Sequence, residues 1–400
     1  MLRTVHESSS GARELAGVLA LLLTGCLAYE PNDLQADAVG ASVIGGFDAT
    51  SPRLDAIGSI SLLTQGAATA PAIFEPECTG ALIGPRTVLT AKHCLAMFSN
   101  VSEERSMVFG IGPDAAAPRV YATVIDTAGA PGDAGGYTNR GHDVGVLRLD
   151  RPLNDVPLVG IATVSDAELG QEFVGIGYGT QANSGYSTTR RLGALTLRAR
   201  AGRTYELLYG SFEAFYRAQT ASSPPANCPA PGTAPALPDD VCTIAQRYRD
   251  VYESMRLEQV EELAVGAGPG DAQPCYGDSG GPLVRAGARG ELIAYGVASG
   301  GVPSDDLVCD YGGIYASLGS EVSSFLTQAT AWRDPCESLL AGGICNGERA
   351  QRCSTPSEGH RRVIEVDCSL VGLRCVPAEN GVTCGEPAAR MPVASAARPM

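Results

Sequence analysis

The chain has 400 residues, enough for two or three domains, and a formal net charge of −15. So acidic a chain is not expected to bind nucleic acid, whose phosphates attract basic surfaces. Charged residues make up only 18% of the chain and 49 residues are glycine, a composition that favours a loop-rich β protein.

Residues 1–25 predict an export signal. The apolar run Leu15–Leu23 is too short to span a membrane and fits the core of a signal peptide. It ends in the stretch Leu23–Cys26, which resembles the lipobox of bacterial lipoproteins and implies cleavage before Cys26 and lipid on that residue. The alternative is an ordinary secretory signal. The chain has 13 cysteines, and setting Cys26 aside leaves 12 that can pair in an oxidising compartment.

After an acidic linker or pro-segment at residues 26–42, short apolar runs alternate with Gly, Pro and Asp. This pattern predicts an all-β domain. The predicted strands are Ile57–Leu63, Ala81–Ile83, Val88–Thr90, Val108–Gly110, Val120–Ile125, Val144–Leu149, Phe173–Ile176, Leu195–Arg198, Pro282–Arg285, Leu292–Ala298 and Gly313–Ala316. A helix is predicted at Ser320–Trp332, where Val322 and Leu326 fall on one side.

Residues from about 201 to 263 depart from the β pattern and predict a helical hairpin inserted in the β domain. Two apolar faces have helical spacing, formed by Tyr205, Leu208, Phe212, Phe215 and Tyr216, and by Val241, Ile244, Tyr248, Val251, Tyr252 and Met255. Asp239 and Asp240 are candidate N-caps of the second helix, and Cys228 and Cys242 would close a local loop. We expect the insert to serve for packing; a substrate-shaping lid is the alternative.

Six cysteines lie between residues 336 and 384. Because so short a segment buries little apolar core, residues 336–386 predict a small module stapled by disulfides. Six cysteines allow 15 pairings, and the sequence leaves the choice open. Residues 387–400 are predicted to be disordered.

Ser279 lies among glycines, which let backbone N–H groups approach a reacting atom closely. A nucleophilic serine needs a base and an oxyanion hole. The chain has four histidines. His6 belongs to the signal and His360 to the cysteine-rich module, which leaves His93 and His142 as candidate bases.

The stretch Gly277–Gly281 also fits the G-x-S-x-G nucleophile elbow of esterases. That fold places its histidine after the serine and alternates strands with helices. Only His360 follows Ser279, inside the stapled module, and no such alternation surrounds the serine. The esterase interpretation is therefore rejected.

Three motifs occur in the order histidine, aspartate, serine: Thr90–Cys94, His142–Leu149 and Gly277–Pro282. They resemble the three catalytic motifs of the chymotrypsin-like (trypsin family) serine peptidases, with Lys92 where alanine is commoner. The stretch Val43–Gly46 resembles the mature N-terminus of that family, and Gly175–Gly179 resembles its Gly-Trp-Gly strand with Tyr for Trp.

The resemblance implies two six-stranded antiparallel β-barrels over residues 43–333, with the helical insert and a C-terminal helix. It implies a serine endopeptidase that works through an acyl-enzyme. His93 would be the general base and Asp143 would orient it, while the backbone N–H groups of Gly277 and Ser279 would form the oxyanion hole. The alternative is a catalytically silent binding or adhesion protein on the same fold.

By the same resemblance the protein is a zymogen, in which the new α-ammonium of Val43 pairs with Asp278 after cleavage. Ser42 precedes Val43, so the activating protease would not cut after Arg or Lys. No cysteine other than Cys26 lies before Val43, so cleavage there would also release the protein from its lipid.

The resemblance places Gln273 at the base of the substrate pocket, with Ser299, Gly300 and Gly301 on one wall and Gly313 opposite. A neutral amide does not compensate the charge of a substrate Lys or Arg. The glycines on the walls leave room, so we expect cleavage after an uncharged side chain of medium or large size.

The disulfides implied for the catalytic domain are Cys78–Cys94, Cys228–Cys242 and Cys275–Cys309. The C-terminal module resembles small cysteine-rich modules of secreted myxobacterial proteins. No cofactor or metal is expected. The expected partners are a protein or peptide substrate, an activating protease, and a membrane reached only through lipid on Cys26. The expected location is that of an exported lipoprotein, outer-membrane or periplasm-facing, which cleavage could release outside the cell.

Overall fold

The computed structural model describes residues 43–65, 71–102, 104–132, 142–179, 188–228, 241–257, 261–266, 270–303, 309–339, 342–354, 361–378 and 381–386. Outside them lie several predicted features: the signal peptide, Cys26, the linker 26–42, the helix caps Asp239 and Asp240, His360 and the tail 387–400. Within the described residues, no helix is both long enough and apolar enough to cross a membrane.

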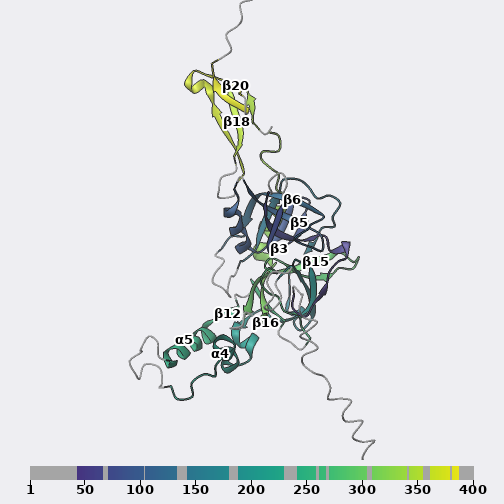
Figure 1. Cartoon of the computed structure of the whole chain (residues 1–400), viewed down its shortest axis with the longest axis vertical. Coiled ribbons are helices and arrows are strands. Elements are labelled where there is room, and N and C mark those ends of the chain that lie inside the picture. Colours follow the sequence, from purple (N-terminus) through teal and green to yellow (C-terminus); the bar gives the residue numbers. More distant parts are fainter. Residues whose placement is uncertain are drawn as a thin grey trace, which may run out of the picture. The chain divides into compact units, whose positions relative to one another are not determined.

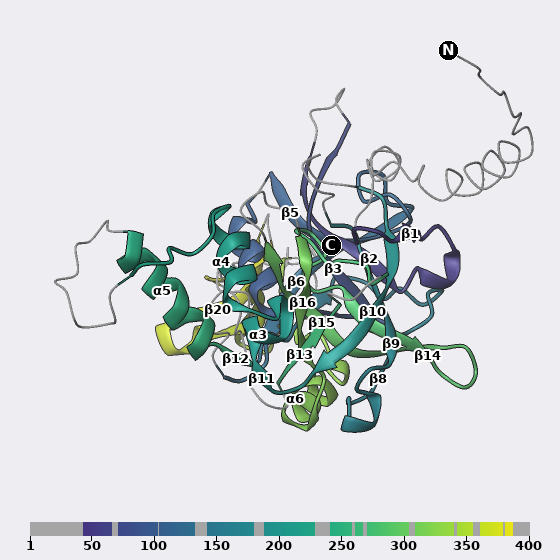
Figure 2. The same cartoon turned by 90° about the horizontal axis from the view of Figure 1, so that it is seen from below.

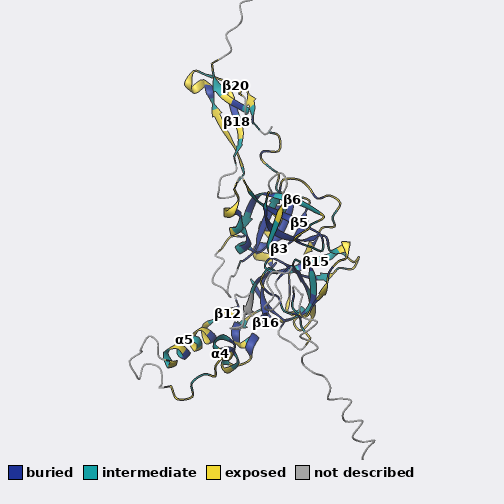
Figure 3. Cartoon of the chain, in the orientation of Figure 1, coloured by how far each residue is buried: buried dark blue, intermediate teal, exposed yellow. Residues whose placement is uncertain are grey.

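Six antiparallel strands close the first barrel in the order β2-β3-β4-β7-β6-β5. They are β2 (Ile57–Thr64), β3 (Ile73–Gly84), β4 (Thr87–Thr90), β5 (Arg105–Ile111), β6 (Val120–Gly129) and β7 (Gly145–Leu149). Figure 1 labels β3, β5 and β6 among them. The 3-10 helix η1 (Pro52–Leu54) precedes β2, and η2 (Lys92–Asn100) follows β4. Apolar side chains such as Leu89, Phe109 and Leu147 fill the interior and are fully buried. Figure 3 shows the strands of this barrel coloured largely as buried.

The second barrel also has six strands, because β10 pairs with both β9 and β13 and so closes the ring β10-β13-β16-β15-β14-β9 (Figure 2). Its strands are β9 (Glu172–Gly177), β10 (Arg191–Ala199), β13 (Glu262–Val265), β14 (Pro282–Ala286), β15 (Leu292–Pro303) and β16 (Cys309–Ser317). Two short strands extend it: β1 (Phe47–Asp48) pairs with β10, and β8 (Gly160–Ile161) pairs with β15 ahead of η3 (Asp166–Glu168). The predicted pair of six-stranded antiparallel barrels is confirmed.

The predicted C-terminal helix is α6 (Ser320–Thr330), and it belongs to the core of the first barrel. Its buried side chains are Val322, Leu326 and Ala329, at helical spacing. Thr87 on β4 donates its hydroxyl to the carbonyl of Ala329 at 3.3 Å. The chain therefore returns from the second barrel to cover the first.

The predicted helical insert is present, but its described residues form three helices, so the prediction of a two-helix hairpin was wrong. They are α3 (Thr204–Tyr209), α4 (Phe212–Thr220) and α5 (Val241–Ser254), flanked by the short paired strands β11 (Gly202–Arg203) and β12 (Arg256–Leu257). Gly210 ends α3 with φ of 74°, and the Ser211 side chain accepts the N–H of Ala214 as the N-cap of α4. Glu262 already belongs to β13, so the insert ends before the predicted limit of about 263.

Aromatic side chains form the core of the insert. The ring of Phe215 lies 4.6 Å from that of Tyr205 and 5.5 Å from that of Tyr252, measured between centroids. Their cluster continues into Ala264 of β13 and Ile314 of β16. The insert thus shares its core with two strands of the second barrel, as the packing interpretation expected. The disulfide Cys228–Cys242 joins the segment after α4 to α5.

The C-terminal module consists of the strands β17 (Ile344–Asn346), β18 (Arg349–Ser354), β19 (Arg362–Asp367), β20 (Arg374–Ala378) and β21 (Gly381–Gly385), with the 3-10 helix η4 (Cys368–Val371). Its disulfides are Cys336–Cys353, Cys345–Cys375 and Cys368–Cys384, one of the 15 possible sets. Within the described residues its buried core cluster holds only Ala350, Cys368 and Val382. Disulfides therefore replace the apolar core that so short a segment lacks.

A buried arginine fixes the N-terminal segment to the second barrel. Arg190, just before β10, is fully buried, and its guanidinium contacts Asp55 at 3.4 Å. It also donates to four backbone carbonyls, those of Ala49, Ser51, Leu54 and Ile57. A buried cation is tolerated only when its donors are satisfied in this way.

Replacing this arginine should strongly destabilise the fold. In Arg190→Met, the four carbonyls and Asp55 lose a buried donor, so we expect the free energy of unfolding to fall by about 3–5 kcal/mol. The control is Arg289→Met, because that side chain is 91% exposed and its loss should change stability by less than about 0.5 kcal/mol. Urea unfolding of both variants measures the difference. Equal effects of the two substitutions would contradict the assigned role.

Candidate active site

The first barrel brings a histidine and an aspartate together at the ends of two neighbouring strands. His93 follows β4 on η2, Asp143 precedes β7, and these strands pair with Thr90 opposite Gly145. The ring Nδ1 of His93 lies 2.7 Å from Oδ2 of Asp143, and the backbone N–H of His93 donates to Oδ1 at 2.8 Å. Both carboxylate oxygens therefore hold His93. The proton on Nδ1 leaves Nε2 as the basic nitrogen of the neutral ring.

Asp143 is fully buried and receives a third donor from the second barrel. The hydroxyl of Ser299, on β15, donates to Oδ2 of Asp143 at 2.6 Å. The resemblance places Ser299 on the pocket wall, and the structure shows in addition that its side chain contacts the aspartate. Sequence reasoning missed this contact because the direction of a strand side chain toward another barrel depends on how the barrels meet.

The Ser279 loop docks against the strands that carry His93. The carbonyl of Ser279 accepts the N–H of Thr79, on β3, at 2.8 Å and lies 3.7 Å from the Cys94 sulfur. Cys94 is bonded to Cys78, next to Thr79. The structure therefore places Ser279 beside the segment that contains His93.

Two glycines of this loop have conformations that only glycine adopts easily. Gly277 has φ of 93° and Gly280 has φ of 79°. A Cβ on Gly277 would lie 2.8 Å from the Cα of Gly179, and one on Gly280 would lie 2.0 Å from the hydroxyl oxygen of Thr90. The loop thus packs with its backbone directly on neighbouring segments.

Asp278 points away from solvent toward the N-terminal segment. Its Oδ2 accepts the N–H groups of Val43 at 3.2 Å and Cys275 at 2.9 Å, and its Oδ1 accepts that of Gly179 at 2.8 Å. Burial raises the pKa of Asp278 to about 6, against the lowering effect of these three hydrogen bonds. Val43 and Asp278, predicted as a pair, therefore lie in contact.

The predicted pocket residues lie on neighbouring segments, with Ser299, Gly300 and Gly301 consecutive on β15. The side-chain oxygen of Gln273 accepts the N–H of Gly312 at 2.6 Å, and Gly313 pairs with Gly301 between β15 and β16. Gly300 precedes Gly301 on the same strand. The disulfide Cys275–Cys309 joins the Ser279 loop to β16.

The other candidate base, His142, contacts a glutamate. Nε2 of His142 lies 2.6 Å from Oε1 of Glu261, the residue before β13. His93 is therefore the histidine that pairs with the buried aspartate, although His142 is the neighbour of Asp143 in sequence. His360 lies outside the described residues.

Lys92, which stands where alanine is commoner in the histidine motif, forms hydrogen bonds with the segment that follows β6. Its ammonium donates to the carbonyls of Ala130 at 2.9 Å and Gly132 at 2.6 Å. Its backbone N–H donates to the carbonyl of Asp143 at 3.3 Å. The unusual residue type was the only sequence signal of this role.

Among the described residues, one group has potential ligand atoms close enough for a metal ion, namely Cys78, His93 and Cys94. The two cysteines form a disulfide with each other, so neither offers a thiolate. The arrangement therefore gives no reason to assign a metal to this site.

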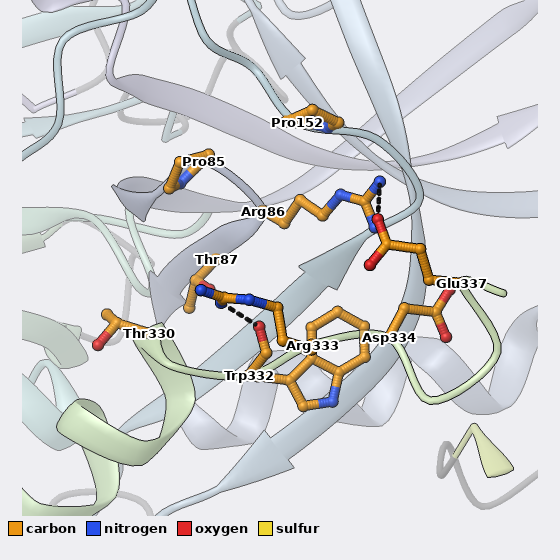
Figure 4. A pocket seen from close by; sticks show the side chains of 9 residues that line it. All are labelled: Pro85, Arg86, Thr87, Pro152, Thr330, Trp332, Arg333, Asp334 and Glu337. Atoms are coloured by element: carbon orange, nitrogen blue, oxygen red, sulfur yellow. Dashed lines mark hydrogen bonds and ion pairs between the residues drawn. The ribbon is translucent and has the colours of Figure 1, made fainter.

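A separate cavity of 340 Å³ lies between the β3–β4 turn and the segment after α6 (Figure 4). Arg86 and Glu337 line it and form an ion pair at 3.5 Å, and the Arg333 guanidinium donates to the carbonyl of Trp332. None of the predicted site residues lines this cavity. The site is thus defined by the hydrogen bonds around His93 and Ser279.

Comparisons with known proteins bear on the family to which the chain belongs. The family model described as Trypsin matches residues 43–214 and 231–318. Trypsin zeta of Drosophila melanogaster is 26% identical over 267 residues, which cover 65% of this chain and 76% of the relative. Trypsin zeta of Drosophila erecta is 25% identical over 253 residues, covering 61% and 71%. A solved structure titled "Structure of GrC" is 16% identical and covers 72% of this chain and 99% of its own, with a TM-score of 0.44. Since the family model matches more than half of its residues, the chain belongs to the trypsin family.

Proposed function

We propose that this trypsin-family protein is a serine endopeptidase in which Ser279 is the nucleophile, His93 the general base and Asp143 its orienting partner. The observation that carries the proposal is the pairing of the partly exposed His93 with the fully buried Asp143, with 2.7 Å between Nδ1 and Oδ2. Burying a carboxylate costs free energy unless hydrogen-bond donors contact it. Asp143 has no exposed surface, and its contacts with His93 favour one tautomer and one orientation of the imidazole ring.

The chemistry follows from these positions. Nε2 of His93 takes the proton of the Ser279 hydroxyl as the oxygen attacks the substrate carbonyl, and Asp143 stabilises the imidazolium that forms. The backbone N–H groups of Gly277 and Ser279 donate to the oxyanion of the tetrahedral intermediate. His93 then returns the proton to the leaving amine, and water hydrolyses the acyl-enzyme by the same steps. No cofactor enters this scheme.

Active-site labelling tests the nucleophile and its base. We expect wild-type protein trimmed to Val43 to react with a fluorophosphonate probe, Ser279→Ala to show no labelling, and Asp143→Asn to lose about 10⁴-fold in peptidase rate. Ser324→Ala, at an exposed position on α6, is the matched control and should label as wild type does.

Labelling that persists in Ser279→Ala would refute the assigned nucleophile. Folded wild-type protein that takes up no probe and cleaves no peptide would instead favour the alternative, a catalytically silent binding protein on this fold.

We also propose that the chain is a zymogen activated by cleavage between Ser42 and Val43. In the uncleaved chain a neutral amide faces the buried Asp278, and Val43, a β-branched residue, has φ of 51°, which such residues seldom adopt. Cleavage would place an ammonium against the carboxylate and would remove the preceding carbonyl that restricts φ. Both changes favour the docked N-terminus.

The stability of the two forms should differ with pH. In the uncleaved chain the pKa of Asp278 is raised from 3.8 to about 6, so the folded state binds the proton more tightly than the unfolded chain. The carboxyl of Asp278 therefore contributes to stability below about pH 3.8, and this contribution is lost as the pH rises from 3.8 through about 6. The ammonium of the trimmed form removes this penalty, so trimming should stabilise by about 2–3 kcal/mol at pH 7 and by little at pH 4.

Thermal unfolding of trimmed and uncleaved protein at the two pH values measures the effect. The control is Asp278→Asn, in which the stability difference between the trimmed and uncleaved forms should no longer depend on pH. A difference between the forms that is the same at pH 4 and pH 7 would contradict the proposed ion pair.

We propose that the enzyme does not select Arg or Lys before the cleaved bond. Gln273 is neutral, and its oxygen already accepts the N–H of Gly312, so a substrate cation would enter without compensation. Peptides with an uncharged residue at this position should have kcat/KM at least about tenfold above matched Arg and Lys peptides. Gln273→Asp should narrow the gap. A wild-type preference for Arg would overturn the assignment of Gln273.

The remaining proposals concern export and the role of the C-terminal module. Residues 1–25 would be a signal peptide, with lipid on Cys26, and 26–42 a linker that cleavage separates from the domain at 43–333. The module 336–386 would bind substrate or a surface, or protect the C-terminus. Support for export comes from the disulfides, which form in oxidising compartments.

A further inference from the structure

Thr79 connects the three segments on which the proposed catalysis depends. It lies on β3 and is fully buried. Its N–H donates to the carbonyl of Ser279 at 2.8 Å, and its hydroxyl donates to the carbonyl of Gly277 at 2.9 Å. The same hydroxyl accepts the N–H of Tyr178 at 3.1 Å. Thr90, three residues before His93, donates its hydroxyl to the carbonyl of Thr79 at 2.9 Å.

The hydroxyl of Thr79 bonds to Gly277, a residue whose backbone is not restricted by a side chain of its own. Gly277 has φ of 93° and no side chain to restrict its backbone, so its two flanking peptide units rotate more freely than those of other residues. One of these units carries the N–H assigned to the oxyanion hole, and the other carries the carbonyl that Thr79 binds. Holding the carbonyl therefore limits the rotation of the N–H.

The opposite side of Gly277 is closed by backbone. A Cβ there would lie 2.8 Å from the Cα of Gly179, whose N–H donates to Asp278. Tyr178, the neighbour of Gly179, is the residue whose N–H the Thr79 hydroxyl accepts. Gly277 thus lies between the segment 178–179 and Thr79, and the single hydroxyl bonds to both.

We propose that Thr79 is a positioning residue that sets the orientation of the oxyanion hole. It touches neither substrate nor the reacting atoms. It acts through the peptide units of Gly277 and Ser279, from a strand of the first barrel to a loop of the second. The inference rests on the proposed function, because an oriented oxyanion hole matters only for an enzyme.

The test compares the loss of the hydroxyl with its retention. Thr79→Val keeps the volume of the side chain and removes the hydrogen bonds of the hydroxyl, while Thr79→Ser keeps the hydroxyl. The matched control is Thr87→Val on β4 of the same hairpin, because Thr87 is 3% exposed and its hydroxyl also donates to a backbone carbonyl, that of Ala329. All variants are made in the full chain, trimmed to Val43, and their unfolding temperatures are measured.

The readouts are the second-order rate of fluorophosphonate labelling at Ser279, and kcat and KM on a peptide that wild type cleaves. For Thr79→Val we expect the labelling rate and kcat to fall at least about tenfold with KM little changed. Thr79→Ser should stay within about threefold of wild type, and Thr87→Val should match wild type even where its unfolding temperature falls. If Thr79→Val does not fold, Thr79→Ala replaces it.

Two results would overturn the inference alone. In the first, wild type is labelled and Thr79→Val is labelled equally fast. In the second, Thr87→Val slows as much as Thr79→Val, which would mean that both hydroxyls act only through stability. A folded wild-type protein that takes up no probe would overturn the proposed function itself, and this inference with it.

Discussion

The site depends on one buried carboxylate. Asp143 has no exposed surface, and its oxygens receive the backbone N–H of His93, the ring Nδ1–H of His93 and the hydroxyl of Ser299. Two donors come from the first barrel and one from the second. A charge in so dry a place is stable only if all of these contacts are present together. The orientation of His93 is therefore a property of the interface between the barrels rather than of either barrel alone.

A second buried carboxylate, that of Asp278, belongs to the Ser279 loop and has different hydrogen-bond donors. Asp278 accepts the backbone N–H groups of three described residues, and burial raises its pKa to about 6. Asp143, by contrast, has a histidine that can carry positive charge. Among the described residues, one buried carboxylate thus contacts a histidine, while the other is held by backbone N–H groups where the N-terminal segment docks.

The sequence predicted those parts of the fold that local patterns determine. Alternating apolar runs located most strands, and glycine-rich motifs located Ser279. The strand β13 was missed because its four residues begin with Glu262 and follow a helix, so neither length nor alternation marks it. The break between α3 and α4 depends on Gly210, which a helical face alone does not reveal. The contacts of Ser299 and Thr79 arise only when the barrels meet, and as residue types both resemble ordinary strand positions.

The path of the N-terminal segment has a consequence for how the chain folds. Phe47 pairs with Leu192, and Arg190 binds carbonyls as far back as Ala49, so the segment that leads into the first barrel is completed by residues of the second. Contacts so distant in sequence require long loops to close before they stabilise anything, and chains rich in them fold slowly. The first barrel emerges from the ribosome well before its partner strands. The segment that leads into the first barrel therefore packs completely only after the strands of the second barrel have been made.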